Sequence, residues 1–252
     1  MKKKKIDQLL DDHFKQLGIK KNDNILIHAN LSSFGILENR KLPEIVIRKL
    51  IHRIGKKGSI VMPLYNLGFN SNKIFDDKMI YAKGMSVLYF KFFQDFSTFK
   101  SKSLIHRHIG LGKDAKCLLK TKSSISLGYK SDFHYLLSKN FNLLLLGCKA
   151  SEGATYLHHL EALVGVPYRK WIKIKFKTKK NRKINYQYLN YYARKNSNYI
   201  ENFDKFFSKI NKKLIKSANL RFGSSNLISL KNLHNEGIKA LKKNKYCLVK
   251  KR

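Results

Sequence analysis

A histidine and a glutamate three positions apart, His158 and Glu161, have the clearest capacity for acid–base chemistry in this 252-residue sequence. They follow Thr155, which we predict to be the N-cap of a helix that runs to about Val164. The positive end of a helix disfavours a charged imidazole, so a neutral His158 can accept a proton while Glu161 orients its ring. Attack by an amine on an acyl group requires this proton transfer. The same spacing also fits a His158 that hydrogen-bonds a carbonyl and a Glu161 that lies on the surface.

A turn of small and hydroxyl-bearing residues, His28–Gly35, follows a predicted buried strand at residues 24–29. Ligands of α/β sheets bind beyond the carboxyl ends of strands. The hydroxyls of Ser32 and Ser33 and the backbone N–H groups of the turn suit a phosphate group. Many strand–turn–helix junctions have the same composition, so the turn by itself indicates a binding position and not a ligand.

The segment Arg107–Gly112 matches R-x-x-G-x-G, the loop that grips the pyrophosphate of coenzyme A in the large superfamily that includes histone acetyltransferases. In that superfamily the loop joins a central strand to a helix. Residues 99–103 would have to supply the strand, and Phe-Lys-Ser-Lys-Ser is a poor one. We therefore interpret the match as coincidental.

The elements that must position these residues alternate between buried strands and amphipathic helices. Helices are expected at residues 6–17, 42–54, 84–96, 113–119, 131–138 and 155–164, and buried strands at 24–29, 59–63 and 141–147. Residues 64–83 are predicted to form a long irregular loop of the kind that is functional or mobile. Residues 171–178 alternate apolar and lysine side chains, as a strand at a sheet edge does. The remainder is predicted to be mostly helical, with a short strand near the end. This order indicates an α/β layered fold in a single domain over residues 1–252.

The composition restricts the class of protein. No apolar run reaches the ~18 residues of a membrane span, and the basic start lacks the apolar segment of a signal peptide. The three cysteines are odd in number and far apart, so we predict neither a disulfide framework nor a metal site, and a cytoplasmic location. The net charge of +37 comes mainly from lysines along the whole chain, which is typical of solvated surfaces as well as of nucleic-acid binding.

An ordered series of short motifs extends from residue 27 to residue 169. It comprises Ile27–Gly35, Gly58–Pro63, Phe75-Asp76 with Gly84-Met85, Lys100-Ser101 with His106 and Gly112–Ala115, Gly128–Phe133, Leu143–Gly147, Thr155–Glu161 and Pro167–Arg169. Each motif is weak alone, but the ordered set resembles the aminoglycoside 3-N-acetyltransferase family over residues 20 to 170. The Lys- and Tyr-rich part, residues 171–252, diverges from it.

The resemblance implies a three-layer α/β/α sandwich around a central mixed sheet, with acetyl-CoA as co-substrate and no metal. It implies direct acetyl transfer to an amine, with His158 as the general base and Glu161 beside it. It implies a coenzyme site formed by His28, Ser32, Ser33, Gly35, Lys100, Ser101 and His106, and an acceptor site near Asp76 and Thr155.

The identity of the acceptor is not implied as directly, because the sequence departs from the family pattern. Asn30 stands where the family has Ser, Lys100 where it has Arg, and Asp132 where it has Pro. The positive field of the whole chain repels cations and attracts anions. We therefore expect a neutral or anionic amine, such as an amino sugar, rather than an aminoglycoside, and a monomer or a homodimer.

A second hypothesis is a repurposed, non-catalytic protein that binds nucleic acid. Tyrosines interleave with Lys and Arg in the C-terminal part, as on a base-stacking surface; they are Tyr186, Tyr188, Tyr191, Tyr192 and Tyr199. Tyrosines that pack a helix against the sheet would give the same pattern. We prefer the enzyme hypothesis, in which nucleic acid and membrane are not partners.

Overall fold

A seven-stranded mixed sheet lies at the centre of the computed structural model, which describes residues 3–35, 39–66, 74–75, 85–180 and 183–252. Its strands, in spatial order, are β10 (Ile215–Leu220), β11 (Gly223–Ser229), β6 (Asn142–Leu146), β1 (Asn24–Ala29), β2 (Ser59–Pro63), β5 (His108–Leu111) and β4 (Phe99–Lys100). β6, β1 and β2 run parallel in the middle, whereas the outer strands pair antiparallel with their neighbours. The central strands are apolar runs because both of their faces are covered.

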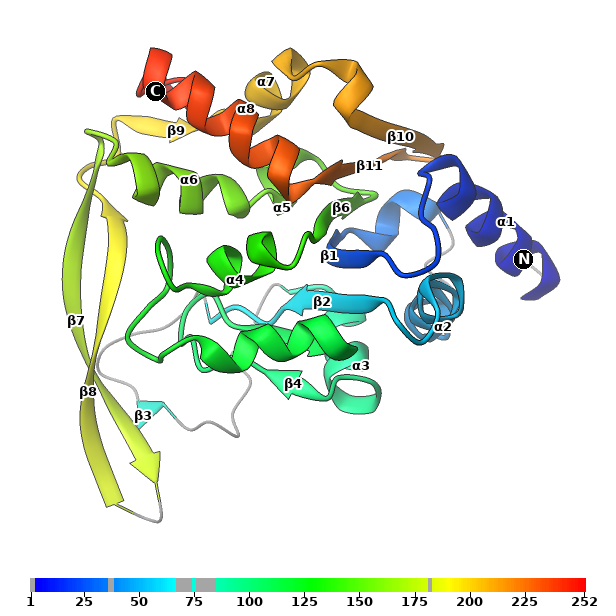
Figure 1. Cartoon of the computed structure of the whole chain (residues 1–252), viewed down its shortest axis with the longest axis horizontal. Coiled ribbons are helices and arrows are strands. Elements are labelled where there is room, and N and C mark those ends of the chain that lie inside the picture. Colours follow the sequence, from blue (N-terminus) through cyan, green and yellow to red (C-terminus); the bar gives the residue numbers. More distant parts are fainter. Residues whose placement is uncertain (1–2, 36–38, 67–73, 76–84, 181–182) are drawn as a thin grey trace.

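Helices cover both faces of this sheet (Figure 1), which confirms the predicted three-layer α/β/α sandwich. One face carries α1 (Lys3–Gln16), α2 (Leu42–Ile54) and α3 (Val87–Asp95), and the other carries α4 (Asp132–Ser138), α6 (Tyr156–Val164) and α8 (Leu230–Lys243). Alternate residues of β1 enter different cores: Ile25 and Ile27 pack under the first layer of helices, and Leu26 packs under the second.

The remaining elements are short and lie between these layers or beside them. They are α5 (Ala150–Gly153), α7 (Phe203–Lys209), the 3₁₀ helices η1 (Leu31–Phe34), η2 (Lys113–Lys120) and η3 (Lys212–Leu214), and the paired strands β9 (Tyr199–Glu201) and β12 (Val249–Lys251). The predicted helix at residues 113–119 is therefore a 3₁₀ helix. Most of the predicted loop at residues 64–83 lies outside the described residues.

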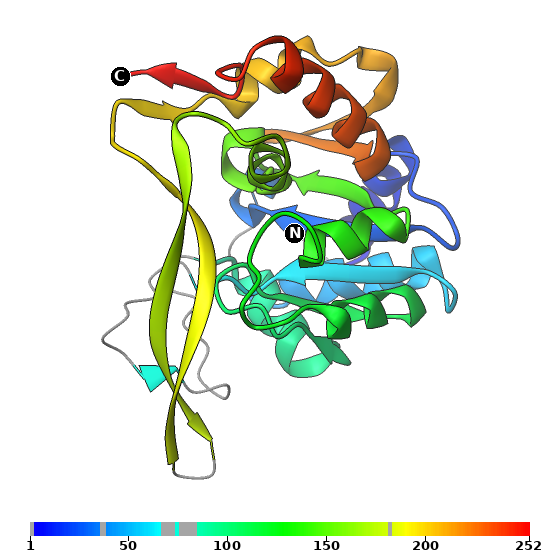
Figure 2. The same ribbon diagram turned by 60° about the vertical axis from the view of Figure 1, so that its left-hand side comes forward.

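A long hairpin projects from the body of the molecule (Figures 1 and 2). Its strands are β7 (Arg169–Lys180) and β8 (Lys183–Arg194), which form a separate sheet with β3 (Ile74–Phe75). The prediction of a strand at residues 171–178 is confirmed, but its assignment to the edge of the main sheet is wrong.

The prediction that most of the chain after residue 178 is helical is also wrong, because β8, β9, β10 and β11 lie there. Pairing across the hairpin decides the conformation of its Lys- and Tyr-rich strands: the ammonium of Lys173 lies 4.5 Å from the ring centre of Tyr188, and Lys175 lies 4.3 Å from that of Tyr186. These cross-strand pairs have no signature in local helix propensity.

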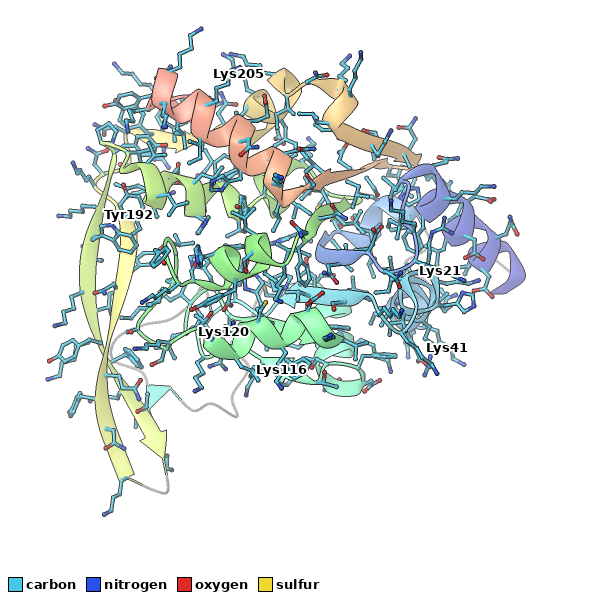
Figure 3. The ribbon with its side chains drawn as sticks, in the orientation of Figure 1. Lys21, Lys41, Lys116, Lys120, Tyr192 and Lys205 are labelled. Carbon is cyan, nitrogen blue, oxygen red and sulfur yellow. The ribbon has the colours of Figure 1, made fainter. Side chains whose placement is uncertain are left out.

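The lysine side chains are spread over the surface and do not gather in one patch. Figure 3 places the labelled Lys21 and Lys41 on one side of the molecule, Lys116 and Lys120 on another, and Lys205 on a third. This distribution is that of solvated charges around a globular body. Among the described helices, none has the length and apolarity needed to cross a membrane.

The contact between α6 and α8 depends on Gly237, where a Cβ atom would lie 2.3 Å from Leu160 Cδ1. We expect Gly237→Val to lower the free energy of unfolding by about 1–3 kcal/mol, because the larger side chain overpacks this contact. The corresponding fall in Tm is about 3–10 °C by scanning calorimetry. The exposed Lys239→Val on the same helix is the control and should change Tm by less than about 2 °C. Equal shifts for the two variants would contradict this account of the contact.

Candidate active site

Two adjoining pockets open beyond the carboxyl ends of β1, β2 and β6. The first, of about 430 Å³, is lined by His28, Tyr65 and Thr155 among others and is called here the His28 pocket. The second, of about 520 Å³, is lined by Ser32, Ser33 and Lys149 among others and is called the Ser32 pocket. Asn30, Cys148 and Glu152 line both pockets. Their position is the one expected for ligands of a parallel sheet.

His158 and Glu161 face each other on α6, as predicted. His158 Nδ1 lies 2.7 Å from Glu161 Oε2, and the glutamate side chain is 0% exposed, so the alternative of a surface glutamate is wrong. An ionised carboxylate accepts hydrogen bonds only, so this contact requires the proton on Nδ1. His158 Nε2 is then the nitrogen with the free lone pair, and the imidazole side chain remains 20% exposed. The ring is held in the tautomer that a general base needs.

Two arginines and a second glutamate complete the charged network around His158. Arg169 Nε lies 2.8 Å from Glu161 Oε2 as an ion pair, at an angle outside hydrogen-bond geometry. Arg169 Nη2 lies 3.2 Å from Glu201 Oε1, and Arg194 pairs with the same oxygen. Arg169 Nη2 also lies 3.1 Å from His158 Nδ1, beside a nitrogen that already donates to Glu161. The network joins α6 to the base of the hairpin and to β9.

The charge state of Glu161 follows from these contacts. Burial raises the pKa of Glu161, but the charges of His158 and Arg169 and the hydrogen bonds from His158 and Tyr168 outweigh it and hold the pKa below its usual value. The Tyr168 hydroxyl donates to Glu161 Oε1 at 2.7 Å. Glu161 is therefore an anion at neutral pH, and it can stabilise a proton on His158.

The predicted turn after β1 is held by its own polar groups. The Asn30 side chain accepts a hydrogen bond from the Ser32 N–H at 3.1 Å and caps η1. The Ser33 hydroxyl donates to the Gly147 carbonyl and is nearly buried, so it ties the turn to the end of β6. Gly35 has a positive φ of 68° and no room for a Cβ atom beside Arg221, so it is a structural requirement. Ser32 is the exposed hydroxyl of this group.

A buried cluster of aromatic and imidazole rings forms the inner wall of the His28 pocket. The Tyr65 ring lies 6.0 Å from His28 and 5.3 Å from His106, centre to centre. Burial lowers the pKa of His28 to about 3, and burial also lowers the pKa of His106 well below its usual value. Both rings are neutral. His28 Nε2 is buried and has no hydrogen-bond partner within the described part of the chain.

Two other residues predicted to bind the coenzyme, Ser101 and Lys100, are not among the described residues that line the two pockets. Ser101 is buried, and its hydroxyl accepts from the Ser103 N–H at 3.0 Å within the segment that precedes β5. Lys100 lies on β4 at the far edge of the sheet and is not among the described residues that line either pocket. Asp76, predicted near the acceptor, lies outside the described residues.

Thr155 is the N-cap residue of α6, as predicted, and it lines the His28 pocket, but its side chain does not cap the helix. Its backbone is already helical, with φ −55° and ψ −22°, and its side chain accepts no capping hydrogen bond. The neighbouring His159 is fully buried, and its Nδ1 lies 3.3 Å from the Ser131 hydroxyl.

The R-x-x-G-x-G match is explained by packing. Gly110 lies inside β5, where a Cβ atom would be 2.6 Å from that of Ala115, and the Arg107 side chain donates to the Ser103 carbonyl at 3.1 Å. The segment is a strand of the main sheet, and not the loop between a strand and a helix that a pyrophosphate would require.

Sequence analysis missed Arg169 as a functional residue, together with Glu201 and Arg194. Arg169 belongs to the Pro167–Arg169 motif, which could have indicated it as a site residue. Glu201 and Arg194 reach the site because β9 pairs with β12 and β8 pairs with β7, and the sequence has no local signal for either pairing.

Comparison with known proteins places this geometry in a family. The family model for aminoglycoside 3-N-acetyltransferase matches residues 26–242. Among solved structures, aminoglycoside acetyltransferase AAC(3)-Xa is similar with 16% identity and a TM-score of 0.80, over 94% of this chain and 92% of that one. AAC-IIIb in a binary complex with CoASH has 17% identity and a TM-score of 0.78, over 94% and 96%. The YokD protein from Bacillus subtilis has 20% identity and a TM-score of 0.76, over 95% and 94%. No curated protein sequence matches the chain.

We expect Glu161→Gln to lower the free energy of unfolding at neutral pH by about 2–5 kcal/mol, because it removes the fully buried carboxylate that pairs with Arg169 and accepts from His158 and Tyr168. The pKa of Glu161 is lower in the folded than in the unfolded state, so its stabilising effect is complete above the ordinary glutamate pKa and is lost as the pH falls through the lowered value. The difference between parent and variant should therefore shrink below about pH 4 in urea titrations.

The control for this prediction is Asp12→Asn, which removes an exposed carboxylate on α1. It should change the urea midpoint little at any pH. A Glu161→Gln deficit that stays constant from neutral pH to pH 3 would contradict the role of the ionised carboxylate.

Proposed function

Because the chain belongs to the aminoglycoside 3-N-acetyltransferase family, and is therefore an acyltransferase, we propose that it transfers the acetyl group of acetyl-CoA to an amine of an aminoglycoside or amino sugar. The observation that carries the proposal is the contact of 2.7 Å between His158 Nδ1 and the buried Glu161 carboxylate. A histidine oriented in this way can act as a general base.

In the proposed reaction, His158 Nε2 accepts a proton from the acceptor nitrogen, which then attacks the thioester carbonyl. The Glu161 anion stabilises the imidazolium that forms, and Arg169 keeps that carboxylate ionised and in place. Since part of the His158 side chain reaches solvent, the proton can leave to water afterwards. Because the three residues have different roles in the reaction, substitution of each is expected to change the kinetics in a different way.

The coenzyme is proposed to lie across the Ser32 pocket, with its acetyl group in the His28 pocket. In the first pocket the Lys149 ammonium and the exposed Ser32 hydroxyl, which would have to turn from Asn30 Oδ1, are proposed to bind phosphate. In the wall of the second pocket, His28 Nε2 is a polar atom with no hydrogen-bond partner among the described residues. The solved structure of AAC-IIIb, which shares this fold, contains CoASH. Thr155, assigned to the acceptor, lines the same pocket as His28, so donor and acceptor would meet there.

The acceptor is proposed to be a cationic amine, in contrast to what the net charge alone suggests. Between residues 133 and 235 the sequence has four acidic residues, Glu152, Glu161, Glu201 and Asp204. Glu161 and Glu201 pair with Arg169 and Arg194, which leaves Glu152 and Asp204 as the carboxylates of the pocket walls. Glu152 lines both pockets and Asp204 lines the second. Because Coulomb interactions in water fade within about a Debye length, these two carboxylates and the single Lys149 ammonium beside them determine the field in the pockets more than the distant lysines do. The local charge supports an aminoglycoside-like amine.

The function is tested by the release of free coenzyme A thiol from acetyl-CoA, with panels of aminoglycosides and of uncharged or anionic amino sugars run side by side. We expect turnover with at least one aminoglycoside. Turnover with the uncharged or anionic amino sugars alone would support the acceptor expected from the net charge. Absence of turnover with both panels would contradict the proposed reaction.

His158→Ala should lower turnover about 10²-fold or more, because the acceptor nitrogen loses its general base. The affinity for acetyl-CoA, measured by isothermal calorimetry, should change less than about 2-fold, since the imidazole acts in the transition state. The control is His52→Ala, which removes an exposed imidazole on α2 and should leave both quantities unchanged. Full turnover in His158→Ala would exclude this histidine from the reaction.

A further inference from the structure

A second chain of polar side chains, separate from the His158 network, ends at the His28 pocket. Asp132 Oδ2 lies 2.8 Å from His108 Nδ1, and His108 Nε2 lies 3.2 Å from the hydroxyl oxygen of Tyr65. The exposed fractions are 1% for Asp132, 0% for His108 and 4% for Tyr65. Tyr65 lines the pocket beside Thr155. A carboxylate, an imidazole and a hydroxyl in this order form the arrangement that moves a proton to and from a hydroxyl oxygen.

Three elements of the main fold bring these residues together. Tyr65 follows β2, His108 is the first residue of β5, and Asp132 is the first residue of α4. β2 and β5 pair antiparallel with Pro63 opposite His108, so the register places His108 beside the segment that carries Tyr65. The contact is therefore set by the sheet and not by a flexible loop.

Packing alone does not account for the chain of polar groups. Asp132 Oδ1 is buried and, among the described residues, has no hydrogen-bond partner. A buried carboxylate with one partner costs free energy that apolar side chains of similar size would not. Buried ionisable groups that border a pocket are typical of sites that move protons.

The imidazoles that contact Tyr65 besides His108 are His28 and His106. Burial holds His28 and His106, the other imidazoles that pack on Tyr65, in their neutral forms, with the pKa of His28 at about 3. Burial also raises the pKa of Tyr65 well above its usual value, an effect that the Thr155 side chain opposes. When the Asp132 carboxylate accepts from His108 Nδ1–H, His108 Nε2 is the nitrogen that accepts from the Tyr65 hydroxyl.

The chemistry proposed above needs a second proton path. An ammonium acceptor loses two protons for each acetyl group transferred: one goes to solvent, and the other must reach the sulfur that leaves the thioester. His158, with 20% of its side chain exposed, can release the first to water. The Tyr65 chain is closed to solvent, so a proton stored on it returns to the pocket.

We propose that Tyr65 carries the second proton from the attacking nitrogen to the departing sulfur of coenzyme A, and that His108 and Asp132 hold it in between. The inference rests on the proposed function. As the nitrogen–carbon bond forms, the nitrogen proton passes to the Tyr65 oxygen while the Tyr65 hydroxyl proton moves to His108 Nε2. As the carbon–sulfur bond breaks and its electron pair remains on sulfur, His108 returns the proton to Tyr65, which protonates the sulfur. The three residues end as they began.

Tyr65→Phe removes the hydroxyl and keeps the ring. With acetyl-CoA, kcat should fall about 10- to 100-fold while both KM values change less than about 2-fold. The matched control is Tyr156→Phe, which removes another buried tyrosine hydroxyl that contacts a histidine, 3.0 Å from His234 Nδ1, outside both pockets. It should leave kcat within about 2-fold of the parent.

An acetyl thioester of an aromatic thiol, used as the donor in place of acetyl-CoA, distinguishes proton transfer by Tyr65 from a structural role of Tyr65. An acidic thiol leaves as a thiolate and needs no proton from Tyr65. With this donor, Tyr65→Phe should lie within about 3-fold of the parent, whereas His158→Ala should stay slow. Asp132→Asn, which keeps the size of the side chain, is the second variant and should show the same dependence on the leaving group.

Full kcat of Tyr65→Phe with acetyl-CoA, or an equal deficit with both donors, would overturn the proton relay and leave the proposed function standing. Absence of turnover by the unaltered chain with every acceptor would remove the proposed function, and the relay with it.

Discussion

The ionised carboxylate of Glu161 is the interaction on which the arrangement of this site depends. A buried anion must be compensated, and the compensating groups come from three elements: His158 from the same helix, Tyr168 from the segment after it, and Arg169 from the first position of the hairpin. Removing the anion would take away one of the two carboxylates that contact Arg169 and the hydrogen-bond acceptor of His158 Nδ1. The orientation of the His158 ring, the docking of the hairpin and the position of β9 therefore all involve contacts of Glu161 or of its partner Arg169.

The net charge of the chain and the charges that line the pockets lead to opposite expectations for the charge of the acceptor. The distance of each charged group from the pockets decides which expectation is preferred. The sequence has 53 basic and 16 acidic residues, yet the pocket walls carry Glu152 and Asp204. The lysines labelled in Figure 3 lie on separate sides of the body, and salt screens charges exposed in this way. A composition can predict the surface field of a protein, but the field inside a pocket depends on the few charges that the fold places there.

The features predicted correctly from the sequence are those with local signals. The apolar runs of β1, β2 and β6 and the pairing of His158 with Glu161 depend on neighbours within one turn or one strand. The features missed depend on pairing between distant segments: β8 was expected to be helical, Glu201 reaches His158 only through β9, and His108 meets Asp132 across 24 positions. No periodicity in a single sequence encodes such contacts.

The hairpin has a mechanical consequence that follows from its first and last residues. Arg169 and Arg194 are opposite each other at its base, and both guanidinium groups contact Glu201. Strands of 12 residues extend on the order of 40 Å from that base. A force on the far end of the hairpin would therefore act on the distance between the Arg169 and Arg194 guanidinium groups, which belong to the charged network around His158.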